Sequence, residues 1–259
     1  MIDTAQEMLI KCYNGLDQTT PAQTSSGRVE LFFALSSDLG NFYPDFRQLS
    51  SEKELARAGK FLSDSERETY LACHAMLRLI LSERIGVNPE EVSYAAGVYN
   101  KPGLQGDSLF FNISHTKKAF AIAVSSTGAL GLDIEDIDRK VDIDSVTGSY
   151  FSDKELEFTM ESDSGTEERF FMLWTRKEAL LKAMGTGIID DLRQVEVSGE
   201  ENYVNADLFN KNYCRASIIR DYFIYSKLLG RHYLSLAMPY PQPISFTQLD
   251  EINIKSYLA

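Results

Sequence analysis

Several stretches of the chain have the nearly continuous apolar pattern of buried β-strands. Residues 29–35 read VELFFAL, residues 119–125 read AFAIAVS, and residues 109–114 (LFFNIS) form a similar run. A turn at residues 126–128 leads into ALGLDIEDI, in which apolar and acidic residues alternate. Short runs rich in β-branched and aromatic side chains, bounded by turn residues, predict strands rather than helices.

Two other segments have apolar residues at helical spacing. Before the first, Ser63 and Glu66 fit the pattern of a capping box, and Gly86 follows the last apolar position. The second runs from about residue 167 to residue 184 and ends at Gly185. A glycine after the last apolar position is a common helix end. We therefore expect helices at both places.

The order of these elements favours an α+β fold. Strands and helices mix without the regular alternation of a doubly wound parallel sheet, and the last third of the chain alternates strand-like runs with turns. A soft boundary near residue 127 divides the chain into residues 1–127 and residues 128–259. Residues 1–28 are expected to form a loose leader, because most of residues 14–28 are polar turn formers.

Composition and charge narrow the classes of function. The chain has 38 Asp and Glu against 26 Lys and Arg, which gives a formal net charge of −12. This charge argues against a nucleic-acid binder and against electrostatic attachment to anionic membranes, although a local basic pocket can still bind a phosphate. The 3 cysteines are widely scattered, and the start lacks the pattern of a signal peptide. These features predict a cytoplasmic protein.

Two acidic residues, Asp133 and Glu135, lie on the predicted strand GLDIE. Side chains two residues apart on a strand share a face, so these carboxylates project together and repel each other. A hard cation such as Mg²⁺, which prefers oxygen ligands, would relieve that repulsion. The alternative is a solvated acidic face, and this motif alone favours the alternative.

A second polar cluster lies on the predicted helix, in the segment WTRKEALLK at residues 174–182. Glu178 and Lys182 are four residues apart, so their side chains are neighbours. The alternative is an ordinary surface ion pair. A third carboxylate beside a metal, with an ammonium one turn away, would suit phosphoryl transfer, because metal and lysine can share the charge of a diphosphate.

Two further segments carry groups that can bind phosphate. Ser114 and His115 end the strand-like run FNISH, and Lys101 follows a predicted turn. Each has a simpler explanation, since Ser-His pairs are common in turns and lysines are common in exposed loops. A serine hydrolase is not favoured, because the chain has no G-x-S-x-G elbow. The order and spacing of the motifs carry more information than any one of them.

In that order, the motifs resemble those of the phosphopantetheinyl transferases, specifically the longer single-chain type that activates peptide and polyketide synthetases. The family pattern combines a Lys-Pro turn, F-N-x-S-H, G-[VI]-D-[VI]-E and W-[ST]-x-K-E-[AS]-x-x-K. The matching positions are Lys101-Pro102, residues 111–115, residues 131–135 and residues 174–182. The helical stretch from about residue 55 to residue 85 also fits the family.

The resemblance implies an enzyme of the holo-[acyl-carrier-protein] synthase type. Such an enzyme transfers the 4′-phosphopantetheine of coenzyme A to a serine of an acyl or peptidyl carrier protein and releases 3′,5′-ADP. Two similar α+β halves would pack about a pseudo-twofold axis with the substrate between them, and a monomer would suffice. Mg²⁺, with Mn²⁺ as the alternative, would be held by Asp133, Glu135 and Glu178, with Glu178 and Lys182 catalytic. Coenzyme A would contact Arg57, Lys101, Ser114, His115 and Lys182.

Two positions complicate this assignment. The family usually has a basic residue where this chain has Thr69, and Arg67 is the candidate to replace it. Glu155 matches an acidic family position sometimes assigned to the catalytic centre, so it competes with Glu178 for the role of general base. Ser152 and Glu155 also fit a capping box, and we favour this role for Glu155.

Two other classes of function are alternatives. A non-catalytic module that binds coenzyme A or a nucleotide would need the phosphate contacts but not three metal-facing carboxylates. A metal-dependent phosphohydrolase would use the same acids and pass the phosphoryl group to water. A carrier protein is usually acidic, so we expect it to dock on an apolar patch with a few basic residues, including Lys117 and Lys118. The alternative for these two lysines is a solvated hairpin turn.

Overall fold

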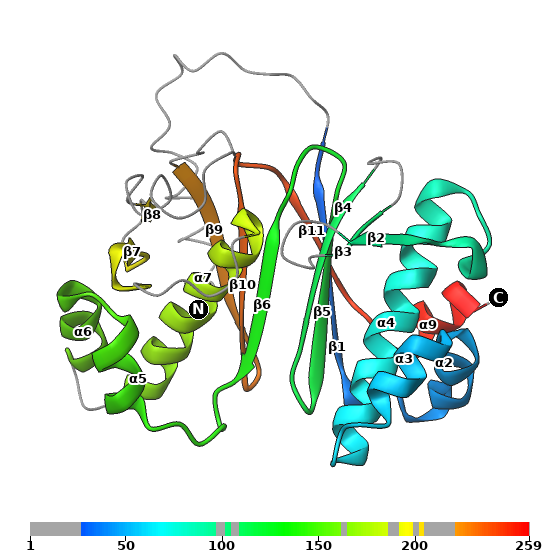
Figure 1. Ribbon diagram of the computed structural model, residues 1–259, viewed down its shortest axis with the longest axis horizontal. Coiled ribbons are helices and arrows are strands. Elements are labelled where there is room, and N and C mark those ends of the chain that lie inside the picture. Colours follow the sequence, from blue (N-terminus) through cyan, green and yellow to red (C-terminus); the bar gives the residue numbers. More distant parts are fainter. Residues whose placement is uncertain are drawn as a thin grey trace, which may run out of the picture.

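The structure of the 259-residue chain is a computed structural model that describes residues 27–96, 102–104, 109–161, 165–185, 192–198, 202–204 and 221–258. Two β-sheets lie side by side at the centre of the molecule, and helices cover their outer sides (Figure 1). The mixture of helices with mainly antiparallel strands confirms the α+β fold expected from the sequence. In the described part of the chain, no helix is both long and apolar enough to span a bilayer.

The first sheet has the strand order β11-β1-β5-β4. These strands are β1 (Val29–Leu35), β4 (Phe110–His115), β5 (Ala119–Ser125) and β11 (Ile244–Gln248). β11 runs parallel to β1, and the other pairs are antiparallel. The outer side carries helices α2 (Tyr43–Leu49), α3 (Glu52–Ala58), α4 (Asp64–Ile85) and α9 (Glu251–Leu258) (Figure 1). A short antiparallel pair is formed by β2 (Tyr94–Ala96) and β3 (Pro102–Leu104).

The second sheet has the strand order β6-β10-β9-β8-β7, with all pairs antiparallel. Its strands are β6 (Gly131–Asp136), β7 (Val195–Glu196), β8 (Asn202–Val204), β9 (Asp221–Leu229) and β10 (His232–Met238). Helices α5 (Ile143–Tyr150), α6 (Asp153–Met160) and α7 (Thr166–Met184) lie on the outer side of this sheet (Figure 1).

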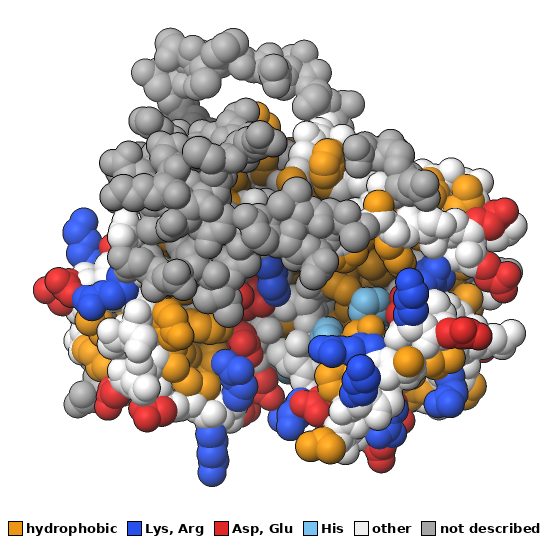
Figure 2. Space-filling model, in the orientation of Figure 1, with side chains coloured by type: hydrophobic (Ala, Val, Ile, Leu, Met, Phe, Trp, Pro, Cys, Tyr) orange, Lys and Arg blue, Asp and Glu red, His pale blue; other side chains and the backbone are white. Residues whose placement is uncertain are grey.

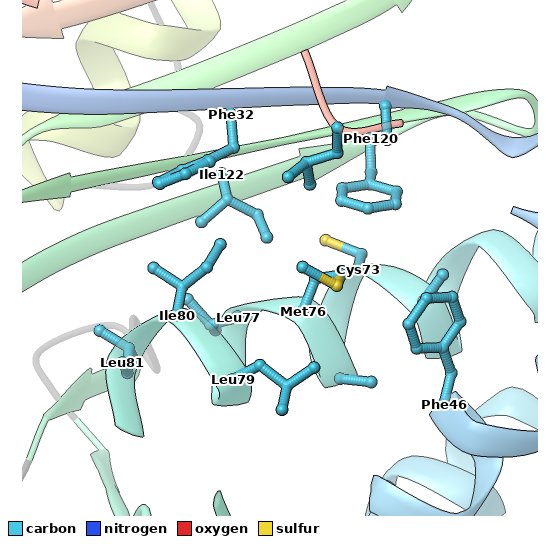
Figure 3. Close-up of a cluster of buried hydrophobic side chains, with 14 of the residues drawn as sticks. Phe32, Phe46, Cys73, Met76, Leu77, Leu79, Ile80, Leu81, Phe120 and Ile122 are labelled. Carbon is cyan, nitrogen blue, oxygen red and sulfur yellow. The ribbon is translucent and has the colours of Figure 1, made fainter. Parts of the chain in front are cut away.

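Strand alternation divides the apolar side chains of β5 between two buried clusters. Ala119, Ala121 and Ala123 belong to the cluster between the sheets, together with apolar residues of β6 and β10. Phe120 and Ile122 point the other way, toward α4 (Figure 3). The small alanines let the second sheet approach closely, while the larger side chains fill the space under the helix.

The predicted elements largely agree with the structure. The runs at residues 29–35 and 119–125 are β1 and β5, and the predicted helix at residues 167–184 is α7. Gly86 and Gly185 end their helices in the left-handed conformation, with φ of 69° and 68°. These two C-terminal boundaries are therefore confirmed.

The capping box predicted at Ser63 and Glu66 is wrong. Ser63 directly precedes α4, but its side chain makes no capping hydrogen bond. Glu66 lies instead 3.4 Å from the Nζ of Lys117, on the turn between β4 and β5. A contact with a residue distant in sequence has replaced the local one.

A buried ion pair recurs in the two parts of the chain. Glu54 closes a capping box at the start of α3, and its carboxylate lies 3.1 Å from Arg78 of α4. Glu155 closes the capping box of α6, and its carboxylate lies 2.8 Å from Lys177 of α7. Arg78 and Lys177 each also donate to two backbone carbonyls in the segment after their helix. This recurrence supports the expectation of two similar halves.

The last part of the chain returns to the first sheet. β11 pairs with β1 from Val29–Ile244 onward, and Leu249 and Ile254 belong to the buried cluster under α4. Residues 244–258 therefore lie with the first sheet, whereas the division at residue 127 assigned them to the second half. The division itself stays a prediction, and the predicted leader lies outside the described residues up to residue 26.

Candidate active site

The close approach of β6 and α7 depends on Gly131. A Cβ at this position would lie 2.0 Å from the carbonyl oxygen of Ala179 and 2.2 Å from the amide nitrogen of Ala183. Both are backbone atoms of α7, which cannot move aside as a flexible side chain could. Glycine therefore lets the helix lie directly on the strand, next to Asp133, which follows two residues later on the same face.

Asp133 is the most enclosed of the predicted metal-binding carboxylates, with 6% of its surface exposed. Its Oδ1 lies 2.7 Å from the Nζ of Lys182 on α7 and accepts a hydrogen bond of 3.0 Å from the Oγ of Ser114 on β4. Its Oδ2 is buried and has no hydrogen-bond partner within the described part of the chain. A buried carboxylate oxygen without a partner is unfavourable, so it is suited to receive a cation.

Glu135 and Glu178 are both affected electrostatically by Asp133. Burial, and then the charge of Asp133, raise the pKa of Glu135 to about 7. Burial and Asp133 also raise the pKa of Glu178. A divalent cation would stabilise the charged form of such crowded carboxylates, so their chemistry fits the predicted metal site. Among the described residues, however, no three His, Cys, Asp or Glu side chains are already arranged around one point as metal ligands.

Basic side chains pair with two of these acids. Lys182, which the sequence placed beside Glu178, pairs with Asp133 at 2.7 Å, and Arg139 lies 3.2 Å from Glu135. Arg139 comes four residues after Glu135 but was not singled out in the sequence, because the strand ends between them. It also lines a cavity of about 560 Å³ beyond the end of β6.

His115 is held between aromatic rings at the other side of the site. Its ring makes edge contacts with Tyr70 and Phe61, at centroid distances of 5.7 and 6.3 Å. Burial, followed by the nearby His74, lowers the pKa of His115 to about 4. His115 is therefore neutral near pH 7 and can bind a phosphate through a neutral N–H rather than as a cation.

Arg57 supplies a positive charge near this histidine. Its guanidinium carbon lies 5.9 Å from the centroid of Phe61, the same ring that contacts His115. The space-filling view shows histidine surface on the α4 side of the molecule, with Lys and Arg side chains beside it (Figure 2). Lys101, the remaining predicted coenzyme contact, lies outside the described residues.

The residues that complicated the family assignment have structural partners. The carboxylate of Glu155 pairs with Lys177 and accepts hydrogen bonds of 2.9 Å from the backbone N–H groups of Ser152 and Val197. Both charged side chains have 0% exposure. Glu155 is thus enclosed in the helix cap that the sequence favoured.

Thr69 and Arg67 are engaged near the start of α4. The Thr69 hydroxyl donates to the carbonyl of Lys117 at 3.0 Å. Arg67 pairs with Asp64 at 2.5 Å and donates to the carbonyl of Phe61 at 3.3 Å. Arg67 is therefore held by the first residue of its own helix and by the segment just before it.

Asn112 is a buried member of this region to which the sequence gave no role. Its Oδ1 accepts a hydrogen bond of 2.7 Å from the backbone N–H of Leu132 on β6. Strand alternation could have indicated it from the sequence. Asn112 and Ser114 are two residues apart, so they share a face of β4.

Comparison with known proteins agrees with the site motifs. The model of the 4′-phosphopantetheinyl transferase superfamily matches residues 129–224, a segment that includes Asp133, Glu135, Glu178 and Lys182. The 4′-phosphopantetheinyl transferase HetI of Nostoc sp. is 34% identical over 160 residues, which are 60% of this chain and 67% of the relative. The 4′-phosphopantetheinyl transferase gsp of Aneurinibacillus migulanus is 24% identical over 61% of this chain and 66% of its own length.

A further relative shares a shorter segment. The 4′-phosphopantetheinyl transferase AcpT of Salmonella typhi is 34% identical over 42% of this chain and 56% of its own length. The family model covers the strand and the helix that carry the predicted acids. Together with the sequence identity to these relatives, this match establishes the family. The chain belongs to the 4′-phosphopantetheinyl transferase superfamily.

Proposed function

We propose that the protein transfers the 4′-phosphopantetheine of coenzyme A to a serine of an acyl or peptidyl carrier protein in the presence of Mg²⁺. The observation that carries this proposal is the meeting of three family motifs at one point. Ser114 of β4 and Lys182 of α7 both contact Asp133 of β6, at 3.0 and 2.7 Å. A phosphate-binding segment, an acidic strand and a basic helix thus converge.

Asp133, Glu135 and Glu178 are the residues that would hold the metal. The unpartnered Oδ2 of Asp133 and the raised pKa values of the two glutamates support this set. Mg²⁺ bound there would neutralise charge on the diphosphate and on the departing 3′,5′-ADP. Lys182 would contribute a second positive charge at the same place.

Glu178 is the proposed general base. The hydroxyl oxygen of the carrier serine attacks the β-phosphorus of coenzyme A, the bond from this phosphorus to the oxygen of the 3′,5′-ADP portion breaks, and the serine proton passes to Glu178 directly or through a water. Glu155 is less suited, because it is fully enclosed and paired with Lys177.

The coenzyme would bind along the first sheet. His115, neutral near pH 7, and Arg57 flank Phe61 and could contact the phosphates of the nucleotide end. Ser114 is 8% exposed and already engaged by Asp133 and by the N–H of Ile134. Its contact with a phosphate would require its hydroxyl to exchange one of these partners.

The test is incubation of the purified protein with coenzyme A, Mg²⁺ and a panel of apo carrier proteins, followed by intact-mass measurement of each carrier. We expect a carrier to gain the mass of phosphopantetheine, and the gain to stop when EDTA removes the metal. Asp133→Ala and Glu178→Ala should reduce the rate by orders of magnitude, whereas Glu157→Ala, an exposed residue of α6, should not. Full activity of either site variant would exclude the mechanism.

The same experiment separates the alternatives. Tight binding of coenzyme A without labelling of any carrier would indicate a binding module. Release of free phosphopantetheine to water would indicate a phosphohydrolase. Replacing Mg²⁺ by Mn²⁺ in the assay would establish which ion supports the transfer.

A further inference from the structure

The junction between the two sheets is made by side chains at two strand edges. β4 is an edge strand of the first sheet and β6 is an edge strand of the second sheet. Polar backbone groups on a buried strand edge need hydrogen-bond partners. Among the described strands, β6 pairs with β10 alone, and its other edge finds its partners outside the sheet.

Asn112 and Ser114 supply these partners in register. The N–H of Leu132 donates to the Oδ1 of Asn112 at 2.7 Å, and the N–H of Ile134 donates to the Oγ of Ser114 at 3.3 Å. Both acceptors and both donors are two residues apart, which is the repeat of a strand. The side chains of β4 therefore take the place of a neighbouring strand's carbonyls.

The same edge carries the reactive groups. The carbonyl of Leu132 accepts from the Nζ of Lys182 at 3.1 Å, so Asn112 and Lys182 hold the two backbone polar groups of one residue. The next residue, Asp133, accepts from Lys182 at 2.7 Å. Any shift of Leu132 away from β4 would therefore change the position of Asp133 relative to Lys182.

We propose that Asn112 is a positioning residue, which holds β6 against β4 through the Leu132 N–H and so sets the geometry between Asp133 and Lys182. Asn112 is 9% exposed and acts through the backbone of β6. Its role for turnover rests on the proposed transferase function, whereas its role in holding the strand does not.

The test variant is Asn112→Leu, which has the same branched shape but is bulkier and cannot accept a hydrogen bond. We expect the amide proton of Leu132 to exchange at least tenfold faster than in the wild-type protein, as followed by NMR. We also expect kcat for carrier labelling to fall about 10- to 100-fold, with the KM for coenzyme A changed less than about threefold. Mn²⁺ should bind more weakly, because Asp133 is displaced.

The matched control is Thr127→Val. Thr127 donates to the side chain of Gln242, another polar link between distant segments that lies outside β6. This variant should leave the Leu132 amide, Mn²⁺ binding and kcat close to the wild-type values. If Asn112→Leu does not fold, Asn112→Ala serves instead, because it leaves room for a water at the same N–H. It should change the Leu132 amide exchange, kcat and Mn²⁺ binding in the same directions but by smaller factors.

Two outcomes would overturn the proposal. One is a deprotected Leu132 amide with an unchanged kcat and unchanged Mn²⁺ binding. The other is a raised KM for coenzyme A at constant kcat, which would make Asn112 a substrate contact. Hydrogen exchange and Mn²⁺ binding need no carrier protein, so they test the positioning role even if the wild-type protein labels no carrier. Failure of the wild-type protein to label any carrier would count against the proposed function alone.

Discussion

The buried pair of Glu155 and Lys177 allows a direct test of whether Glu155 is structural or catalytic. Both side chains have 0% exposure and their charged atoms lie 2.8 Å apart. Burial raises the pKa of Glu155 and lowers that of Lys177, while each charge counteracts the shift of the other. Removing one partner leaves an uncompensated buried charge, which costs about 3–5 kcal/mol of folding free energy.

We therefore expect Glu155→Gln to lower the free energy of unfolding by about 3–5 kcal/mol. For a protein of this size the midpoint of thermal unfolding should fall by roughly 6–20 °C. Urea unfolding followed by circular dichroism measures the free energy, and carrier labelling well below the midpoint measures activity per folded molecule. That activity should stay within a few-fold of the wild-type value.

Two further variants complete the design. Glu155→Leu combined with Lys177→Met removes both charges and should cost less than Lys177→Met alone, because no unpaired charge is left. Lys255→Ala breaks an exposed pair with Glu251 and should change the stability by less than about 0.5 kcal/mol. Unchanged stability of Glu155→Gln with a loss of activity beyond a hundredfold would refute the structural role and make Glu155 the better candidate for the base.

The remaining predictions concern the helix contact and the response to pH. Gly131→Ala should abolish carrier labelling and lower the thermal midpoint, because the new methyl would lie 2.0 Å from the carbonyl oxygen of Ala179; Gly148→Ala in α5, with nothing within 4 Å, should instead stabilise the protein by up to about 1 kcal/mol. Between pH 7 and pH 5 two sets of groups act on the urea midpoint in opposite directions. Burial lowers the pKa of His115 to about 4 and also lowers that of His232, so the unfolded chain binds protons that the folded protein excludes, at a cost of roughly 2 kcal/mol for His115. Glu135, whose pKa is raised to about 7, takes up a proton in the folded protein and opposes this loss. His232→Phe should therefore lose less stability, or gain more, on acidification than the wild-type protein; an unaltered pH dependence in that variant would contradict the assignment.

The pattern of apolar residues was enough to predict those helices and strands that have a strong pattern of their own. Strand β1 and helix α7 have strong apolar patterns, and the glycine after α7 sets its end. Strand β11 reads ISFTQ, which is short and partly polar, and it was not predicted. Its partner in the sheet is β1, at the opposite end of the described chain, so its pairing depends on contacts that no local pattern contains.

The two predicted capping boxes show the same limit within one motif. Ser152 and Glu155 form the box, whereas Ser63 and Glu66 do not, although the spacing is identical. Glu66 pairs with Lys117, which the turn after β4 brings to the start of α4. Tertiary contacts decide which of two equivalent local patterns is realised.

For the candidate site, the sequence indicated which types of side chain take part, but not which of them form hydrogen bonds and ion pairs with one another. The sequence assigned Asp133 and Lys182 to one site but did not predict their direct contact, which the structure shows at 2.7 Å. It did not give a role to Lys177, which precedes Glu178 on α7. Adjacent residues on a helix point about 100° apart, so one enters the core and the next lies beside the acids. Which of them is buried depends on how the helix rotates against the sheet.

The return of β11 to the first sheet means that the polypeptide cannot be divided into two self-sufficient pieces at residue 127. The N–H of Leu249 donates to the carbonyl of Phe33 at 2.7 Å, and that of Val29 donates to the carbonyl of Pro243 at 2.9 Å. A fragment ending at residue 127 would expose the edge of β1 to solvent, and the complementary fragment would carry the missing strand. Co-expressed fragments should therefore reassemble through strand donation, and removal of β11 and α9 from the carboxyl terminus should destabilise the first sheet before the second.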